Sequence, residues 1–543
     1  MPISEKFRNQ SSTAGSTHFI SRATAKYIGF LALAIITFHW KTLLTDQFTM
    51  IIGTEGVNQT YSWLHTWIRS LWSGHIPLWD PNAFGGRPFT EEMAAFYPLH
   101  LLFALIPLNK NGVISPHLYY EYIALNRLLG AIFMFALVRE LRRSHFAAFI
   151  GACAFSMGGL LGRLLWPQYM EACIWLPAIL IFVLRSLRSE HRGGAMVNAT
   201  LAGACLGLSA LTGGAQFSML QGIFVMAVIL YHGFAPGTWT QGRWARLSVL
   251  IGIFFLTAIG MGAAQLLPSI QYGHLSLRAI SGGWFPLTEK IPYSRLVHGM
   301  WPGSITAGLV PAGAQEGGEE PWPYYVGVFP CFLAAMAMWK CWRNPWVRFL
   351  TVCSVIVFAI TLGEFSPLFG VLYAAVPYLW MIRGGARFVY LLSFSIALLS
   401  AFGFDRICTA SGERGEWAPA LQVLKWISVF CIIALFVPVI FTQITLGIWP
   451  CLSLLLILGA SACLFRLILR PPQPALRAVI ALFVLFDLGA FNWVAASKDE
   501  LAKTGDMYVE ALSMRPAAKF IEDQPGLKRV SVRLDVDHQP NVG

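Results

Sequence analysis

Charged residues are scarce in this chain. Asp, Glu, Lys and Arg make up 12% of its 543 residues, whereas soluble domains contain about 25%. Hydrophobic residues make up 56% of the chain. A chain this long and this apolar cannot cover its hydrophobic surface as a soluble domain, so it needs a lipid bilayer as its solvent. We therefore expect an integral membrane protein that crosses the bilayer many times.

Recognisable cysteine and glycine motifs are also missing. The ten cysteines form no CxxC pair and no cysteine–histidine spacing that is typical of a metal site. Most of them lie in apolar runs, where cysteine behaves as a small hydrophobic residue. The sequence has no Gly-rich phosphate loop and no nucleotide-sugar motif. We expect no disulfide framework, and no pattern in the chain requires a metal or a cofactor.

The formal net charge is +12, but the basic residues stand in short clusters between apolar runs. This pattern is produced by membrane topology, so nucleic acid is not the expected partner. A basic N-terminal segment precedes the apolar run 27–44. That run is too long for the apolar part of a signal peptide and is followed by no small-residue cleavage site. We interpret it as a first membrane span that is retained.

The hydrophobic pattern predicts a bundle of transmembrane helices, since each span needs about 17–25 largely apolar residues. A cytoplasmic N-terminus and about thirteen spans place all the main basic clusters on the cytoplasmic side, as the positive-inside rule requires. Two shorter, proline-containing stretches, 96–108 and 366–381, are expected to be interfacial or re-entrant. The predicted spans are 27–44, 117–138, 146–162, 167–186, 195–212, 215–232, 248–270, 324–341, 349–364, 388–404, 424–442, 448–468 and 478–496.

The segment 366–381 decides the topology of the second half. If it crossed the membrane, every later basic cluster would move to the outside. We predict that it does not cross, which leaves Arg383 and Arg387 at the outer surface. These two arginines then break the positive-inside rule, which indicates that something at the outer surface requires positive charge. The same scheme places the loops 45–116 and 271–323 and the tail after residue 496 outside.

The first outer loop combines an apolar helix with a turn-rich segment. Residues 58–74 place several large apolar side chains on one helical face, typical of an interfacial anchor. The segment 77–88 is rich in Pro and Gly and is expected to be rigid. The apolar face consists of Trp63, Leu64, Trp67, Ile68, Leu71 and Trp72.

Several polar residues of the outer loops are candidates for chemistry. Transfer to a hydroxyl group needs a base near the acceptor, and Glu55 is anchored on both sides by neighbouring helices. Arginines such as Arg278 can hold a lipid phosphate through their forked guanidinium group. The alternatives are a solvated loop acid and simple contact with lipid headgroups. Weaker candidates are Gln168, Glu171 and Gln216 at span ends, and Asp487 in the last span is expected to be structural.

The order and spacing of several short motifs resemble a known family. They are Glu55-Gly-Val-Asn-Gln59, Leu71-Trp-Ser-Gly74-His-Ile-Pro77-Leu-Trp79-Asp80-Pro81, Phe84-Gly85-Gly86-Arg87-Pro88, Leu211-Thr-Gly-Gly-Ala-Gln216, Ala264-Gln265-Leu-Leu-Pro268, and the segment from Pro377 through Arg383 to Arg387. The chain resembles the YfhO family of bacterial membrane proteins, within the C-type (GT-C) glycosyltransferase superfold. The family's loop acid is usually Asp where this chain has Glu55, and the family's Pro between the two arginines is Gly385 here.

The resemblance implies an all-α, polytopic transmembrane bundle of GT-C type. It implies that residues 1–496 form the membrane domain, with outer loops at 45–116 and 271–323, and that 497–543 form an extracytoplasmic tail, after which family members usually continue with a further outer segment. The implied activity is transfer of a sugar from a polyprenyl-phosphate donor to a cell-envelope acceptor at the outer face of the bacterial inner membrane. The implied roles are Glu55 as base with Asp46 in reserve, Arg278, Arg383 and Arg387 for the donor phosphate, and Gln59, Asp80, Arg87, Glu91 and Gln216 for the acceptor or sugar.

Two other functions stay open. A transporter or flippase of polyprenyl-linked glycans would typically show internal repeats and binding groups at the bilayer midplane. We find no convincing repeat, and the ionisable residues gather at the outer face. A non-catalytic envelope-assembly protein is the other alternative, because a fold does not fix a function.

Overall fold

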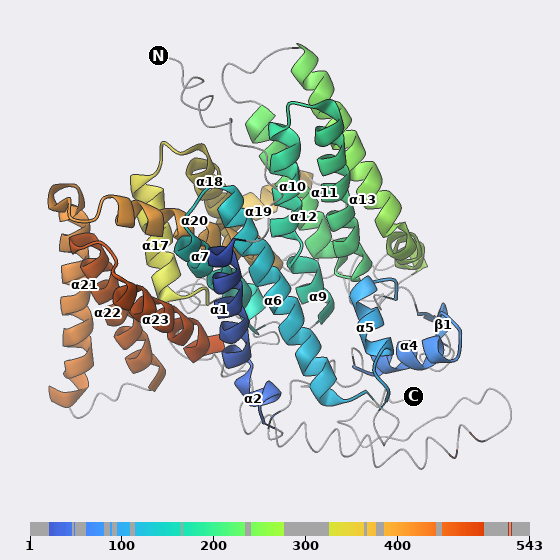
Figure 1. The fold of residues 1–543 in the computed structure, drawn as a ribbon, viewed down its shortest axis with the longest axis horizontal. Coiled ribbons are helices and arrows are strands. Elements are labelled where there is room, and N and C mark those ends of the chain that lie inside the picture. The colour runs from blue at the N-terminus through green and yellow to red at the C-terminus, as the bar shows by residue number, and fades with distance from the viewer. Residues whose placement is uncertain are drawn as a thin grey trace.

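The computed structural model is largely a bundle of α-helices (Figure 1). The described strands are β1 (Trp79–Asp80) and β2 (Arg87–Pro88), which pair antiparallel with Asp80 opposite Arg87. The structure describes residues 21–45, 48, 61–80, 87–89, 95–108, 114–163, 167–233, 241–275, 325–362, 366–375, 385–440, 448–492, 520 and 523.

In chain order the helices are α1 (Arg22–Phe38), α2 (Trp40–Leu43), α4 (Ser62–Trp72), η3 (Pro98–His100), α5 (Leu101–Ala104), α6 (Pro116–Glu140), α7 (His145–Met157), α8 (Gly159–Arg163), α9 (Pro167–Cys173), α10 (Leu176–Arg188), α11 (Arg192–Leu211), α12 (Ala215–Gly233), α13 (Gln241–Leu275), α17 (Val328–Lys340), α18 (Pro345–Thr361), α19 (Pro367–Ala375), η6 (Gly385–Phe388), α20 (Val389–Thr409), α21 (Arg414–Ile440), α22 (Ile448–Leu469) and α23 (Pro474–Asn492).

Each predicted span overlaps a described helix, but the predicted number of spans is not confirmed. Among the described residues, eight helices are long and apolar enough to cross a membrane, or nine if one bent pair forms a single span. That pair is α17 and α18, whose axes differ by 119°. The helix α7 has only 13 residues, because the helix ends at Gly158, whose backbone is extended, before α8 begins.

The centre of the bundle is built from α7 and α20, whose residues are buried on nearly all sides. Small residues allow neighbouring helices to approach closely, as is common in membranes. A Cβ atom added to Gly403 of α20 would lie 1.9 Å from the carbonyl oxygen of Leu333 in α17. Gly203 of α11 also lies close to α13, since its added Cβ would be 2.4 Å from the carbonyl oxygen of Phe254.

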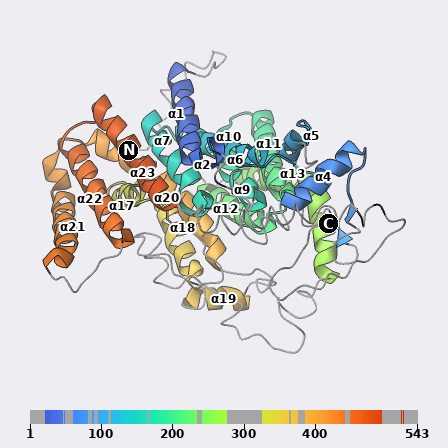
Figure 2. The same ribbon diagram turned by 90° about the horizontal axis from the view of Figure 1, so that it is seen from below.

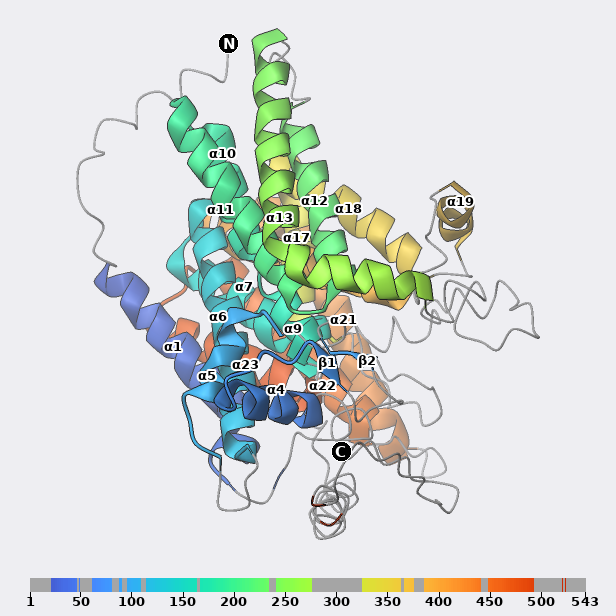
Figure 3. The same cartoon turned by 90° about the vertical axis from the view of Figure 1, so that its right-hand side faces the viewer.

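The outer helices expose large apolar side chains. Leu256 on α13, Phe430 on α21 and Leu482 on α23 are 73%, 68% and 68% exposed. Such surfaces are unfavourable in water and favourable against lipid chains. Figure 3 shows α13 turning sharply in its second half. Pro268 lies inside this helix, and an internal proline removes a backbone hydrogen bond and kinks a helix.

One end of the bundle collects the basic clusters. At the end of α6, Glu140 forms ion pairs with Arg185 at 3.0 Å and with Arg188 at 3.2 Å, both from the last turn of α10. Asp405 of α20 accepts hydrogen bonds from the backbone N–H and the hydroxyl of Ser144, which caps the start of α7. We call this the basic end.

Further contacts join the basic end. Near the start of α1, Thr24 lies 3.4 Å from His145 of α7. Lys340, the last residue of α17, donates to the carbonyl oxygen of Glu416, whose carboxylate also binds Arg406. The helices therefore alternate in direction so that these predicted cytoplasmic clusters meet. That the basic end faces the cytoplasm, with the N-terminus, stays a prediction.

The helix α19 is too short to cross a membrane. Its 9 residues extend for about 13 Å, whereas the hydrocarbon core is about 30 Å thick. It lies beside α18, set apart from the other helices in Figure 2. Residues 376–381 of the predicted non-crossing segment lie outside the described residues.

The apolar face of α4 packs against protein. Leu64, Trp67 and Ile68 are 3%, 2% and 0% exposed, and the indole of Trp67 donates to the carbonyl oxygen of Ala95 at 3.0 Å. The interpretation of this face as a lipid-contacting anchor is wrong for these three side chains. Trp72, at the end of the helix, is the member of that face that stays 48% exposed.

Candidate functional site

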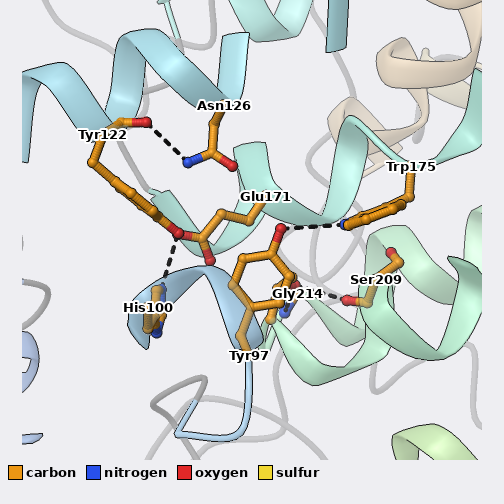
Figure 4. A network of polar contacts seen from close by, with 9 residues as sticks. Tyr97, His100, Tyr122, Asn126, Glu171, Trp175, Ser209 and Gly214 are labelled. Carbon is orange, nitrogen blue, oxygen red and sulfur yellow. Dashed lines mark hydrogen bonds and ion pairs between the residues drawn. The ribbon is translucent and has the colours of Figure 1, made fainter. Parts of the chain in front are cut away.

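A buried carboxylate joins the first predicted outer loop to the bundle. Glu171 of α9 is fully buried. Its Oε1 accepts a hydrogen bond from the hydroxyl of Tyr122 in α6 at 2.7 Å and lies 3.0 Å from Nε2 of His100 (Figure 4). Tyr122 and the Glu140 cluster lie about 27 Å apart along α6, at 1.5 Å per residue. The site therefore lies far from the basic end.

His100 brings the first predicted outer loop to this carboxylate. It is the last residue of η3, whose first residue is Pro98, and proline is well suited to the first position of a helical turn. The imidazole packs edge-on against Trp67 of α4 at 6.0 Å and against Tyr97 at 5.4 Å, measured between ring centroids. These aromatic contacts fix the ring so that Nε2 points at Glu171.

Two buried side-chain oxygen atoms at and beside Glu171 lack hydrogen-bond partners among the described residues. The side-chain amide of Asn126 donates to the carbonyl oxygen of Tyr122 at 3.0 Å. Among the described residues, Oδ1 of Asn126 and Oε2 of Glu171 have no hydrogen-bond partner, although both side chains are 0% exposed. Buried polar atoms are normally paired, so an unpaired carboxylate oxygen is a feature that requires an explanation.

Tyr97 closes one side of this network. Its hydroxyl accepts a hydrogen bond from the indole of Trp175 at 3.3 Å (Figure 4). Burial raises the pKa of the Tyr97 phenol well above its usual value, and the charge of Glu171 adds to the shift. Tyr97 is therefore a neutral phenol at any physiological pH.

The helix α9 is held at its C-terminal end, where helices leave carbonyl groups unpaired. The carbonyl oxygen of Ala172 accepts from Ser209 at 3.1 Å and from Gln221 at 2.7 Å. The carbonyl oxygen of Cys173 accepts from the hydroxyl of Tyr390 in α20 at 2.7 Å. The position of α9 is thus fixed by α11, α12 and α20 together.

The structure describes Arg387, which is predicted to bind the phosphate of the lipid donor. It lies in η6, and its guanidinium carbon is 5.3 Å from the centroid of the Tyr169 ring on α9. Tyr169 packs against Phe217 near the start of α12, while Tyr231 near the end of α12 binds Arg348. The distance from Phe217 to Tyr231 along the helix is about 21 Å. Arg387 and Arg348 therefore lie near opposite ends of α12.

Two predicted acceptor-binding residues are also described. Gln216 is the second residue of α12, and its Oε1 is buried without a partner among the described residues, as is Oε1 of Gln168 on α9. Asp80 is 9% exposed and lies in the hairpin of β1 and β2. Arg87 pairs with it through the backbone. The side chain of Arg87 and the predicted residues Glu55, Asp46, Arg278, Arg383, Gln59 and Glu91 lie outside the described residues.

Glu171 is a weak candidate from the sequence, and His100 and Tyr122 are not candidates from the sequence. An ionisable residue within an apolar segment is a functional hypothesis by default, and this signal was present for Glu171. Histidine and tyrosine in apolar stretches carry no comparable signal, because both are common as ordinary packed residues. Within the described part of the chain, no group of three His, Cys, Asp or Glu residues could hold a metal ion.

Comparison with protein-family models finds no match, and comparison with curated proteins finds none either. Among solved structures, the chain is similar to ArnT from Cupriavidus metallidurans bound to undecaprenyl phosphate, with 12% identity and a TM-score of 0.50 over 88% of this chain and 78% of that one. Apo ArnT gives 13% identity and 0.49 over the same shares of both chains. The apo oligosaccharyltransferase of Archaeoglobus fulgidus gives 14% and 0.41 over 83% of this chain and 56% of that one.

At such low identity the likeness to ArnT shows the fold alone. The chain is a polytopic, all-α membrane protein with the fold of the C-type glycosyltransferases.

Proposed function

We propose that this protein is a YfhO-like glycosyltransferase of the bacterial inner membrane. It transfers a sugar from a polyprenyl-phosphate-linked donor to a cell-envelope acceptor at the extracytoplasmic face. The fold shared with ArnT, which was solved with undecaprenyl phosphate bound, supports a donor carried on a lipid phosphate. The low charge and the exposed apolar helices support a substrate reached from within the membrane.

The observation that carries the proposal is the arrangement around α9. Arg387 lies against Tyr169, and His100 of the first outer loop lies against Glu171, two residues further along the same helix. Group transfer requires a base and a phosphate clamp beside one reacting centre. One short helix thus holds both a first-loop segment and a predicted phosphate-binding arginine, which fixes where the two lie relative to each other.

In the proposed mechanism, Glu55 removes the proton from the acceptor hydroxyl, with Asp46 as the alternative base. The oxygen attacks the anomeric carbon, the bond to the lipid phosphate breaks, and the configuration at that carbon inverts. Arg278, Arg383 and Arg387 stabilise the negative charge that develops on the departing phosphate. Gln59, Asp80, Arg87, Glu91 and Gln216 bind the acceptor or the sugar.

A reconstituted assay tests this function. The protein in lipid nanodiscs is mixed with the lipid extract of a deletion strain, in which the donor is expected to accumulate, and with an envelope fraction from that strain. A nanodisc has no second compartment, so sugar that appears on the acceptor reports transfer and not flipping. Transfer by the wild-type protein supports the proposal. A deletion strain that keeps all its envelope glycans, together with no transfer in nanodiscs, overturns it.

A further inference from the structure

Glu171 and Asp487 are both fully buried carboxylates, but they are bonded differently. In Asp487 of α23, Oδ1 accepts from Tyr325, and Oδ2 accepts from the backbone N–H of Phe329 at 3.0 Å. Both oxygens are used to hold the start of α17. In Glu171, only Oε1 is used, and Oε2 has no partner among the described residues. Both carboxylate oxygens of Asp487 accept hydrogen bonds within the fold, whereas among the described residues one oxygen of Glu171 accepts none.

Tyr169 and Glu171 make their contacts on opposite sides of the helix α9. Successive residues of a helix are rotated by about 100°, so Tyr169 and Glu171 point about 200° apart. Tyr169 faces Arg387, and Glu171 faces His100 of the first loop. The helix α9 therefore stands between the arginine segment and the loop, and its width sets the distance between them.

Other contacts hold α9 in place within the bundle. Its last carbonyl groups are bonded to α11, α12 and α20 through Ser209, Gln221 and Tyr390. An added Cβ at Gly214 would lie 2.7 Å from Cβ of Ala172, so the chain before α12 also packs directly on α9. In the described part of the chain, the pair of Glu171 and His100 is a polar link from α9 to the first loop. Losing that pair removes this link from the loop and leaves the contacts that hold α9 intact.

We propose that Glu171 is a positioning residue: by binding His100 and Tyr122 it clamps residues 97–104 of the first outer loop onto α6 and α9, and so sets the loop at a fixed distance from Arg387. This inference rests on the proposed function for its catalytic consequence, although the clamp itself can be measured without any activity. Oε2 of Glu171 remains available to a donor that arrives when the loop and substrate are both in place.

The clamp is tested first by a distance measurement. Genetically encoded spin labels are placed at Leu105 beside α5 and at Val371 on α19, which are 78% and 63% exposed. The wild-type protein is expected to give one narrow distance distribution. Glu171→Ala is expected to broaden it, and Glu171→Gln to restore it, because glutamine keeps the size and the accepting oxygen of the side chain. An unchanged distribution in Glu171→Ala overturns the clamp, whether or not the protein is a transferase.

Tyr122→Phe provides a milder variant if Glu171→Ala does not fold. It removes one hydroxyl and keeps the ring, so a partial broadening of the same distribution is expected. Asp487→Ala is the matched control, since it removes another fully buried carboxylate with a tyrosine partner. It is expected to lower the unfolding temperature and to leave the distance between the two labels unchanged. Equal broadening by Asp487→Ala and Glu171→Ala would reduce Glu171 to a structural role.

Kinetics complete the test in the nanodisc assay. A misplacement of about 1 Å costs roughly a hundredfold in rate, so Glu171→Ala is expected to lower kcat by about that factor. Its KM for the lipid donor and its Kd for undecaprenyl phosphate should stay within about twofold of wild type. A matching loss of donor binding would overturn the positioning role. If wild type transfers no sugar and the deletion strain keeps all its envelope glycans, the proposed function fails, and the clamp is then tested by the distance measurement alone.

Discussion

Gly403→Ala tests the packing at the centre of the bundle. The added Cβ would lie 1.9 Å from the carbonyl oxygen of Leu333 and 3.3 Å from the backbone nitrogen of Ala337. Real Cβ atoms essentially never approach closer than 3.0 Å, so α17 and α20 must separate by about 1 Å. The atom in the way belongs to the backbone, so no side-chain rotation can relieve the contact.

The magnitude follows from two opposing effects. Overpacking a core costs about 1–3 kcal/mol, and the upper end applies where the backbone itself must move. Replacing glycine by alanine inside a helix contributes about 1 kcal/mol in the opposite direction. We expect Gly403→Ala to lower the free energy of unfolding by about 2 kcal/mol. Gly252→Ala in α13 is the control, because nothing lies within 4 Å of its added Cβ. It should be neutral or stabilising.

Thermal unfolding in detergent measures the difference. The cysteines Cys153, Cys173 and Cys205 are buried, so a thiol-reactive dye reports the exposure of the core on heating. Gly403→Ala should unfold several degrees below wild type, and Gly252→Ala at or above it. Equal unfolding temperatures for the two variants would show that α17 and α20 do not pack as described.

The remaining predictions concern the site and the topology. Glu55→Gln should lower sugar transfer by about a hundredfold or more, because it removes the base. Binding of undecaprenyl phosphate should survive, because the arginines are unchanged. Full transfer by this variant would refute the assignment of Glu55 as the base. Arg387→Ala should weaken binding of undecaprenyl phosphate by about tenfold or more, since it removes a charge-assisted contact. Arg348→Ala, near the other end of α12, should leave that binding unchanged, and an equal loss in both variants contradicts the assignment. Single cysteines introduced in 271–323 should react with a membrane-impermeant reagent added outside intact cells, and labelling only after lysis would reverse the topology.

The sequence was sufficient for the features that depend on local composition. Apolar runs of the right length indicated where helices would lie, since a chain in lipid must satisfy its backbone hydrogen bonds internally. The clusters of arginine and lysine indicated which helix ends belong together, and Glu140, Arg185 and Arg188 do meet at the basic end. Arg387 breaks the same pattern of basic clusters, and this makes it a candidate from the sequence alone.

Tertiary structure decided which apolar surfaces face protein and which face lipid. Lipid tails and protein interiors are equally apolar, so hydropathy could not show that Trp67 is buried while Trp72 is exposed. The breaks before α8 and α10 and the 119° bend between α17 and α18 also depend on packing partners. The same is true of the site. His100 and Glu171 are 71 positions apart in the chain, and they meet because α6 and α9 pack together and the first loop folds over both.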